Sequence, residues 1–428
     1  MTETTDAVDY KDYLLAQVMS HMRFDCEMED EAVLRLIDQC IREEAKKAEM
    51  PIREMLSLRQ ELFHSLRRLD LLSELLEDDE ITEIMINGYA NIFVERGGRL
   101  EQLSKAFASE EKLRDVIQKV VSDCNRRVNE AHPVVDARLL DGSRVNVVLP
   151  PVSLNGATMT IRRFPKEPMT MKRLIQLEAL PDKAADFLEL LVQAGYNIFI
   201  SGGTGSGKTT FLNALSGFIP FRERVITIED AAELQLQGLP NLVRLESRDA
   251  NVEGENAVAI KDLIKASLRM RPDRLIVGEV RDGAALDMLT AMNTGHDGSL
   301  STGHANSAED MLRRLETMVL MAVDMPVPAI QSQIASAIDI VVHLGRLRDR
   351  RRCVLEICEV LGVKEGEYAL KTLFQFVETG TAKGMGAEGR VEGELLFTAP
   401  LQHTEKIKRE GLYEKYQELF CGNLCPEG

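Results

Sequence analysis

The spacing of hydrophobic positions changes along this chain and predicts successive structural regions. In the first part, apolar residues recur at helical spacing, as at Val33, Ile37 and Ile41. Pro51 divides this part into two predicted helices, because proline cannot take part in the hydrogen bonds of a helix interior. We therefore expect an N-terminal helical region over residues 1–75.

The pattern then shifts to short apolar segments separated by turn residues. Asp141-Gly142 lies between two such segments and is typical of a tight hairpin between strands. Together with one amphipathic helical stretch, these segments predict a small α/β domain over residues 76–164. Two prolines in the segment that follows predict a linker over residues 165–175.

Beyond the linker, apolar strands alternate with helical patterns. Predicted strands at Asn197–Ser201, Val225–Glu229 and Leu275–Gly278 are each followed by a predicted helix. This alternation is typical of a parallel sheet covered by helices, so we expect an α/β domain over residues 176–380. The next stretch is rich in glycine, and we assign residues 381–428 to a flexible loop and a C-terminal tail.

A glycine-rich segment joins the first of these strands to the helix that follows it. It reads Gly202-Gly-Thr-Gly-Ser-Gly-Lys-Thr209 and matches the P-loop pattern in its required context. Glycines allow successive backbone N–H groups to turn inward on a phosphate, and the lysine neutralises phosphate oxygens. The sequence thus predicts an ATP site formed by Gly202, Gly203, Thr204, Gly205, Ser206, Gly207, Lys208, Thr209 and Thr210.

Hydrolysis also needs carboxylates near this loop, and two apolar strands end in acids. One ends in Glu229-Asp230 and the other in Glu279, which follows a glycine where a Walker B strand normally has aspartate. We expect Thr209 to ligate Mg²⁺, with Glu229 or Asp230 contributing through water. Glu279 is the expected general base. For any single acid, the ordinary alternative is a surface salt bridge.

The tripeptide Thr-Gly-His occurs twice, ending at His296 and at His304. A histidine at a strand terminus can donate a hydrogen bond to a γ-phosphate, so His304 is a candidate sensor of the nucleotide state. A purely structural role is the alternative for each histidine. Metal ligation is a weaker alternative, because the spacing matches no helical zinc pair.

The net charge of −17 changes the range of expected partners. An acidic surface repels a phosphate backbone, which disfavours direct nucleic-acid binding. The run Arg346–Arg352, with five arginines, is the local exception. It could meet phosphate or anionic lipid, but such runs more often form a solvated hairpin or a subunit contact.

Three further features bear on localisation and metals. No uncharged apolar run approaches the ~20 residues needed to span a bilayer, and the acidic N-terminus is unlike a signal peptide. We therefore expect a cytoplasmic protein. The seven cysteines are scattered and predict free thiols, with zinc binding by Cys421 and Cys425 as the minority interpretation.

Four sequence motifs of this chain, taken together, resemble those of the type II/type IV secretion ATPase superfamily. The resemblance is strongest to its CpaF branch, which assembles tight-adherence pili. The resemblance is carried by the P-loop, by an Asp box over Ile226–Leu234, by an atypical Walker B block over Met270–Arg281 and by a His box over Thr294–Asn306. It implies a RecA-like P-loop core, a homohexameric ring and partners among inner-membrane platform proteins, on the cytoplasmic face of the membrane.

The resemblance also implies that nucleotide is held between the small α/β domain and the RecA-like domain. Arginines of the small domain would then reach the phosphates. Arg144 and Arg162, with Arg138 and Arg163 beside them, stand at the matching positions.

The leading hypothesis is therefore an ATP-hydrolysing motor that couples turnover to domain rotation and so drives platform proteins of a secretion or pilus-assembly machine. A nucleic-acid translocase on the same RecA-like core is the alternative, and the acidic charge counts against it. A third hypothesis is a regulatory protein that binds ATP without appreciable turnover, which the retained acids and His304 disfavour.

Overall fold

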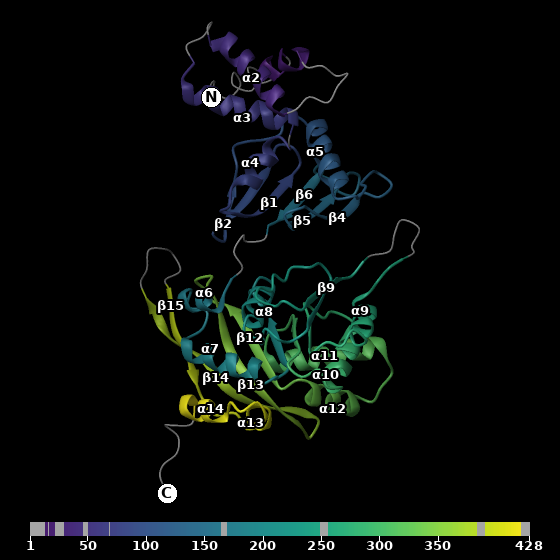
Figure 1. Ribbon diagram of the computed structural model, residues 1–428, viewed down its shortest axis with the longest axis vertical. Coiled ribbons are helices and arrows are strands. Elements are labelled where there is room, and N and C mark those ends of the chain that lie inside the picture. Colours follow the sequence, from purple (N-terminus) through teal and green to yellow (C-terminus); the bar gives the residue numbers. More distant parts are fainter. Residues whose placement is uncertain are drawn as a thin grey trace. The chain divides into compact units, whose positions relative to one another are not determined.

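The computed structural model describes residues 13–15, 17–21, 30–45, 50–67, 69–163, 169–248, 256–382 and 390–420. The chain forms two compact units, Met1–Lys166 and Glu167–Gly428 (Figure 1). Within the described residues no helix is both long enough and apolar enough to cross a membrane. Cys421 and Cys425, and the two prolines of the expected linker, lie outside the described residues.

The N-terminal part of unit 1 is helical, as its apolar periodicity predicts, but it contains more helices than the two expected on either side of Pro51. Residues 13–15 and 17–21 are helical, and further helices follow them. They are α2 (Asp30–Ala45), α3 (Ile52–Arg67) and α4 (Leu71–Glu77), and α3 begins directly after Pro51. The α2 residues Val33 and Ile37 are fully buried against α3, so these helices have a small core of their own.

An antiparallel sheet follows in the same unit. Among the described residues its strand order is β3-β2-β1-β6-β5-β4. A turn at Asp141-Gly142 joins β4 to β5, as expected for this dipeptide, and α5 (Glu110–Asp123) packs its apolar residues into the core of the sheet. The strand bounds are β1 (Ile81–Asn87), β2 (Ile92–Arg96), β3 (Arg99–Gln102), β4 (Val134–Arg138), β5 (Arg144–Val148) and β6 (Thr158–Arg162).

Unit 2 is built on a nine-stranded sheet within the described residues, in the order β15-β14-β13-β12-β7-β11-β10-β8-β9. The strands from β12 to β9 are parallel, and β13, β14 and β15 add an antiparallel meander. The bounds are β7 (Ile198–Gly202), β8 (Val225–Glu229), β9 (Leu242–Glu246), β10 (Arg274–Val277), β11 (Leu300–Gly303), β12 (Ile340–Arg346), β13 (Arg352–Lys364), β14 (Glu367–Ala382) and β15 (Arg390–Phe397).

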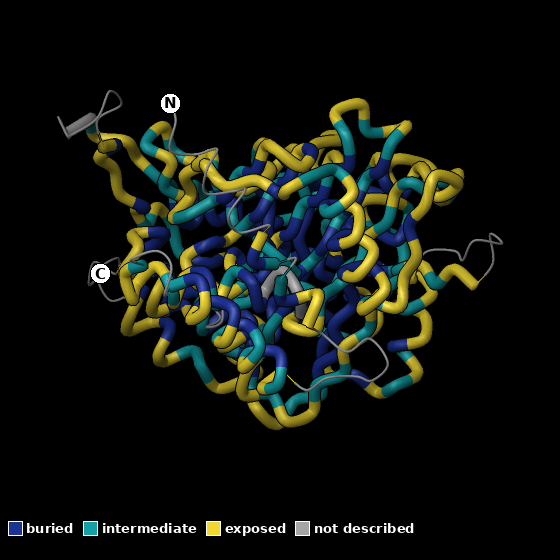
Figure 2. The backbone as a smooth tube through the Cα atoms, turned by 90° about the horizontal axis from the view of Figure 1, so that it is seen from above, coloured by how far each residue is buried: buried dark blue, intermediate teal, exposed yellow. Residues whose placement is uncertain are grey.

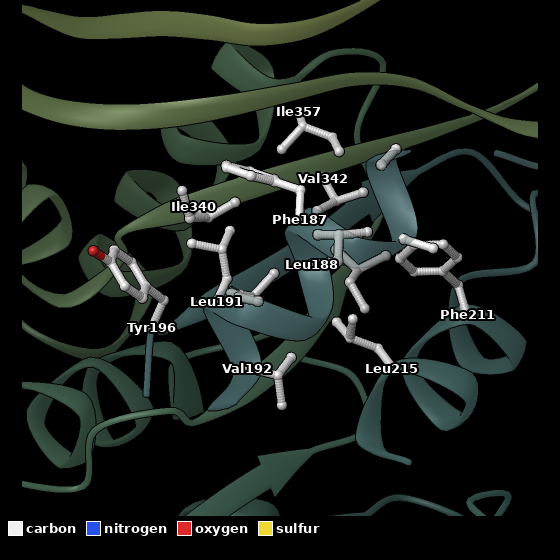
Figure 3. Close-up of a cluster of buried hydrophobic side chains, with 14 of the residues drawn as sticks. Phe187, Leu188, Leu191, Val192, Tyr196, Phe211, Leu215, Ile340, Val342 and Ile357 are labelled. Atoms are coloured by element: carbon white, nitrogen blue, oxygen red, sulfur yellow. The ribbon is translucent and has the colours of Figure 1, made fainter. Parts of the chain in front are cut away.

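Helices cover both faces of this sheet, and the central strand β7 contributes to both cores. Ile198 and Ile200 pack with α7 and α8, whereas Phe199 packs with α10, α11 and α12, because successive strand residues point to opposite faces. Figure 3 shows the first of these cores. The bounds are α6 (Met171–Gln176), α7 (Asp182–Gln193), α8 (Lys208–Ser216), α9 (Ile260–Ser267), α10 (Ala284–Asn293), α11 (Ala308–Ala322) and α12 (Val327–Ala337).

The described residues divide into a buried interior and an exposed periphery. Figure 2 shows stretches of buried backbone in the interior and exposed stretches at the periphery. The strands β7, β8, β10 and β11 are buried along their whole length. The apolar runs that end in the candidate catalytic residues are therefore closely packed on both faces of the sheet.

The C-terminal part of the chain differs from the expected loop and tail. Residues after the glycine-rich stretch form β15 in the sheet, then α13 (Glu405–Arg409) and α14 (Tyr413–Phe420). Buried Glu359 of β13 accepts backbone hydrogen bonds from Gln402 at 2.8 Å and His403 at 2.6 Å. These tertiary contacts hold the segment in place, and a sequence pattern of two short helices does not reveal them.

Candidate active site

The glycine-rich loop joins β7 to α8 at the carboxyl end of the parallel strands. Gly205 and Gly207 have φ of +70° and +91°, a region that favours glycine. Gly202 is required for close packing, because a Cβ there would lie 2.5 Å from the carbonyl oxygen of Leu344. A Cβ at Gly203 or Gly205 would meet nothing within 4 Å, so there is open space beside these two loop residues. The loop conformation thus fits a phosphate cradle.

Lys208 is the first residue of α8 and is only 7% exposed. Its Nζ donates hydrogen bonds of 3.1 Å to the carbonyl oxygens of Gly202 and of Gly203, which hold the ammonium over the loop. Burial lowers the pKa of Lys208, and the nearby charge of Glu279 opposes this shift. Ser206 Oγ is buried in the same loop and has no hydrogen-bond partner within the described residues. A bound anion would engage both groups.

Four side chains from three elements form one polar network beside this loop. Lys208 Nζ donates to Nδ1 of His304 at 3.2 Å, and His304 Nε2 lies 3.0 Å from Oε1 of Glu279. Arg281 donates to Oε2 of Glu279 at 2.8 Å. Because an ammonium can only donate, Nδ1 of His304 accepts, and the ring proton is on Nε2 toward Glu279. That last contact is not an aligned hydrogen bond, so Oε1 of Glu279 has acceptor capacity left.

The charges in this network set the protonation states. Burial raises the pKa of Glu279, but the hydrogen bond and charge of Arg281, with the charge of Lys208, outweigh it and lower the pKa overall. Burial, followed by the charge of Lys208, lowers the pKa of His304. Near neutral pH, Glu279 is therefore ionised and His304 is neutral. An ionised carboxylate with free acceptor capacity is what a general base requires.

Glu229 is the last residue of β8, and its side chain occupies the space beside position 278, where the chain has a glycine. Its Oε1 accepts backbone hydrogen bonds of 2.8 Å from Glu233 and from Leu234, so it fixes the loop after β8. A Cβ on Gly278 would lie 2.9 Å from Cγ of Glu229. The glycine therefore makes room for the glutamate of the neighbouring strand. Glu229 is 3% exposed, and burial raises its pKa.

The candidate Mg²⁺ residues occupy different surroundings. Oε2 of Glu229 is buried and has no hydrogen-bond partner within the described residues, whereas Oδ1 of Asp230 accepts from Ser247 at 2.7 Å. Asp230 Oδ2 lies 3.8 Å from Nη1 of Arg281. Thr209 is half-buried in the first turn of α8. An orphaned carboxylate oxygen and a hydroxyl are hard oxygen ligands that fit Mg²⁺ and its waters.

The two Thr-Gly-His repeats have separate surroundings. His304 follows β11 and belongs to the polar network, where a lysine ammonium beside the ring disfavours metal ligation. His296 precedes β11, and its Nδ1 lies 3.1 Å from the carbonyl oxygen of Ala291 at the end of α10. Of the two, His304 alone contacts the loop lysine.

The candidate arginines of unit 1 lie in one row across three strands. Arg144 of β5 is opposite Arg138 of β4 on one side and opposite Arg162 of β6 on the other. Arg162 is exposed and Arg144 is half-buried. Arg163 differs, because its guanidinium donates to the carbonyl oxygens of Asp78 and, at 3.2 Å, of Ile81. Arg163 is therefore part of the internal structure of the unit.

Sequence reasoning assigned no role to Arg281, although it lies two residues after Glu279. Residues two apart in an extended segment share a side, and this spacing was the available signal. The reason for Gly278 was also missed, because the contact with Glu229 is between different strands.

The fold and the loop together define a P-loop ATPase. The family model described as Type II/IV secretion system protein matches residues 66–417. A protein of Mycobacterium tuberculosis strain H37Rv named for conjugal transfer is 35% identical over 310 residues, which are 71% of this chain and 87% of that protein. The type IV secretion system protein PtlH of Bordetella pertussis is 35% identical over 309 residues, 66% of this chain and 91% of PtlH.

A solved structure agrees with the fold. The ATPase DotB of Yersinia pseudotuberculosis aligns with a TM-score of 0.51 at 18% identity, over 68% of this chain and 78% of that chain. The chain belongs to the type II/IV secretion system protein family and is a nucleotide-binding ATPase of the secretion and pilus-motor class.

The contact between positions 229 and 278 leads to a stability prediction. We expect Gly278→Ala to lower the free energy of unfolding by about 1–3 kcal/mol, because the added methyl group overpacks a buried site. Urea denaturation followed by circular dichroism measures this change. In a Glu229→Ala background the same substitution should cost much less, since the colliding side chain is gone. An equal cost in both backgrounds would exclude the proposed collision.

Proposed function

We propose that this ATPase binds ATP with Mg²⁺ at the loop Gly202–Thr210 and uses Glu279 to activate the attacking water. The observation that carries the proposal is the network joining Lys208, His304, Glu279 and Arg281. It sets an ionised carboxylate with spare acceptor capacity beside the ammonium of a phosphate-binding loop. This pairing provides both substrate charge neutralisation and a base.

The reaction follows from these groups. Lys208 would leave the carbonyls of Gly202 and Gly203 for phosphate oxygens, which carry full negative charge and bind an ammonium more strongly. The water oxygen forms a bond to the γ-phosphorus, the bond from that phosphorus to the β–γ bridging oxygen breaks, and the water proton passes to Glu279. Bound Mg²⁺ would neutralise charge on the phosphate oxygens. Thr209 would hold it directly, and Glu229 or Asp230 through water.

His304 is suited to report on the nucleotide. It is neutral and contacts both Lys208 and Glu279, so any movement of Lys208 toward phosphate breaks one of its contacts. That movement frees Nδ1 of the ring, while the Nε2 proton remains directed at Glu279. The same histidine contacts the base, so occupancy of the γ site and the readiness of Glu279 are coupled.

We further propose that hydrolysis drives rotation of unit 1 relative to unit 2. Arg144 and Arg162 would contact the phosphates from unit 1, so that charge on the nucleotide changes the preferred domain arrangement. The motor would be a hexamer at the inner face of the cell membrane, acting on platform proteins of a pilus or secretion system, with the CpaF branch as the proposed subfamily. The names of its conjugal-transfer and type IV secretion relatives support the secretion role.

The nucleotide site is tested by two substitutions measured together. Lys208→Ala should weaken ATP binding about 10- to 150-fold, as expected for loss of a charge-assisted contact. Glu279→Gln should bind ATP normally and lower kcat by about 10²- to 10⁴-fold. Isothermal titration and phosphate release measure the two effects. Lys265→Ala and Glu309→Gln are matched surface controls. Wild-type turnover by Glu279→Gln would refute its role as base.

The arginine row gives a second kinetic test. Arg144→Ala and Arg162→Ala should lower kcat by up to about 10³-fold with little change in KM, because an arginine finger acts mainly on transition-state charge. Arg99→Ala, on the edge strand of the same sheet, is the control. Unchanged kcat in both variants would rule out the arginine contact with phosphate.

The proposed hexamer is tested by the mass of the particle in the presence of ATP. A mass smaller than that of six chains would rule out the hexamer.

Arg281 gives a prediction about pH. It helps to lower the pKa of Glu279, so Arg281→Gln should raise that pKa. Activity needs ionised Glu279 and is lost as the pH falls through its pKa, so the acid limb of the kcat–pH profile should move to higher pH. The basic limb should move less. Arg313→Gln, which removes a surface ion pair on α11, is the control. An unshifted acid limb would show that Arg281 does not tune the base.

A further inference from the structure

The run Arg346–Arg352 lies beside the phosphate loop. It forms the turn between β12 and β13, closed by a hydrogen bond of 2.8 Å from Leu347 N to Arg351 O. Strand β12 pairs in parallel with β7 so that Leu344 is opposite Gly202, the residue at which the loop begins. The first arginine of the run, Arg346, therefore lies two residues after Leu344, at the same end of the parallel strands as the loop.

The arginines of this turn fall into two groups. Arg348 pairs with Glu378, and Arg351 pairs with Asp349 at 2.8 Å and Glu178 at 2.7 Å. The side chains of Arg346 and Arg352 are exposed and form no hydrogen bond or ion pair with any residue that the structure describes.

Arg346 and Arg352 also face each other directly. They are cross-strand partners in the β12–β13 register. Like charges in this position are destabilising, because their side chains lie on the same face of the sheet. An anion between or beside the two guanidinium groups would remove this cost.

The stem of Arg352 marks where that anion would lie. A Cβ on Gly207 would lie 3.6 Å from Cδ of Arg352, so the arginine packs against the loop residue directly before Lys208. The guanidinium group of Arg352 is bonded directly to Cδ and therefore also lies close to the loop. Arg350 is exposed on the same turn, and no such contact with the loop joins it to the site.

We propose that Arg352, supported by Arg346, is a second cationic contact for the phosphate chain of the bound nucleotide. The inference rests on the phosphate cradle proposed above and adds a residue to it from the β12–β13 hairpin. A phosphate chain is the favoured ligand because the arginine stem packs on the loop whose N–H groups already select phosphate. Arginine suits this role, since its planar fork matches phosphate oxygens.

The test measures binding of ADP, ATP, pyrophosphate and adenosine to the full-length protein by isothermal titration. Arg352→Ala should weaken ADP, ATP and pyrophosphate about 10- to 100-fold and leave adenosine unchanged, because the lost contact is with phosphate. Arg346→Ala should have a smaller effect in the same direction. Arg352→Lys should retain part of the affinity, and Arg352→Gln provides a second neutral variant. Arg350→Ala and Arg348→Ala, from the same turn, are matched controls and should bind as wild type.

The possible results separate this inference from the proposed cradle. If Lys208→Ala weakens ADP binding while Arg352→Ala and Arg352→Gln bind ADP as wild type, the cradle stands and the role of Arg352 is refuted. If Lys208→Ala binds ADP normally, the cradle itself is refuted. Unchanged ADP affinity in Arg352→Ala with lost sedimentation on vesicles containing an anionic phospholipid would identify a lipid contact instead. Unchanged affinity with a smaller oligomer would identify a subunit contact.

Discussion

The site depends on a buried ammonium at the start of a helix. Lys208 is held over the loop by two backbone carbonyls, in a position where burial disfavours its charge. The nearby carboxylate of Glu279 offsets part of that cost, and His304 connects the two. A buried positive charge that is only partly compensated binds a phosphate readily, because the negative phosphate oxygens supply the missing counter-charge.

The rigid parallel strands make this arrangement possible. Strands β7, β11 and β10 are neighbours in the sheet, and their carboxyl ends supply the loop, His304 and Glu279. Because these strands are buried along their whole length, small shifts at their ends are resisted by close packing on both faces. The functional groups lie where these strands end, and the loops that follow the strands bring them together.

Much of this organisation could be predicted from the sequence. The P-loop and the strands that end in Glu229 and Glu279 are local patterns, so they can be recognised from the sequence alone. The C-terminal helices could not be predicted, because α13 and α14 are short and are held by contacts such as those of Glu359. The contact of Arg281 with Glu279 had a local signal in its spacing, whereas the proximity of Arg352 to the loop residue Gly207 joins positions far apart in the sequence.

The contact between Gly278 and Glu229 limits how the site can change over time. A side chain at position 278 overpacks the site while a glutamate occupies position 229, since its Cβ would lie 2.9 Å from Cγ of Glu229. A lineage that acquired an aspartate at 278 could relieve this crowding by shortening residue 229, but it would then lose the hydrogen bonds that hold the loop at Glu233 and Leu234. The two ways of supplying an acid beside the phosphate loop are therefore separated by a destabilised intermediate.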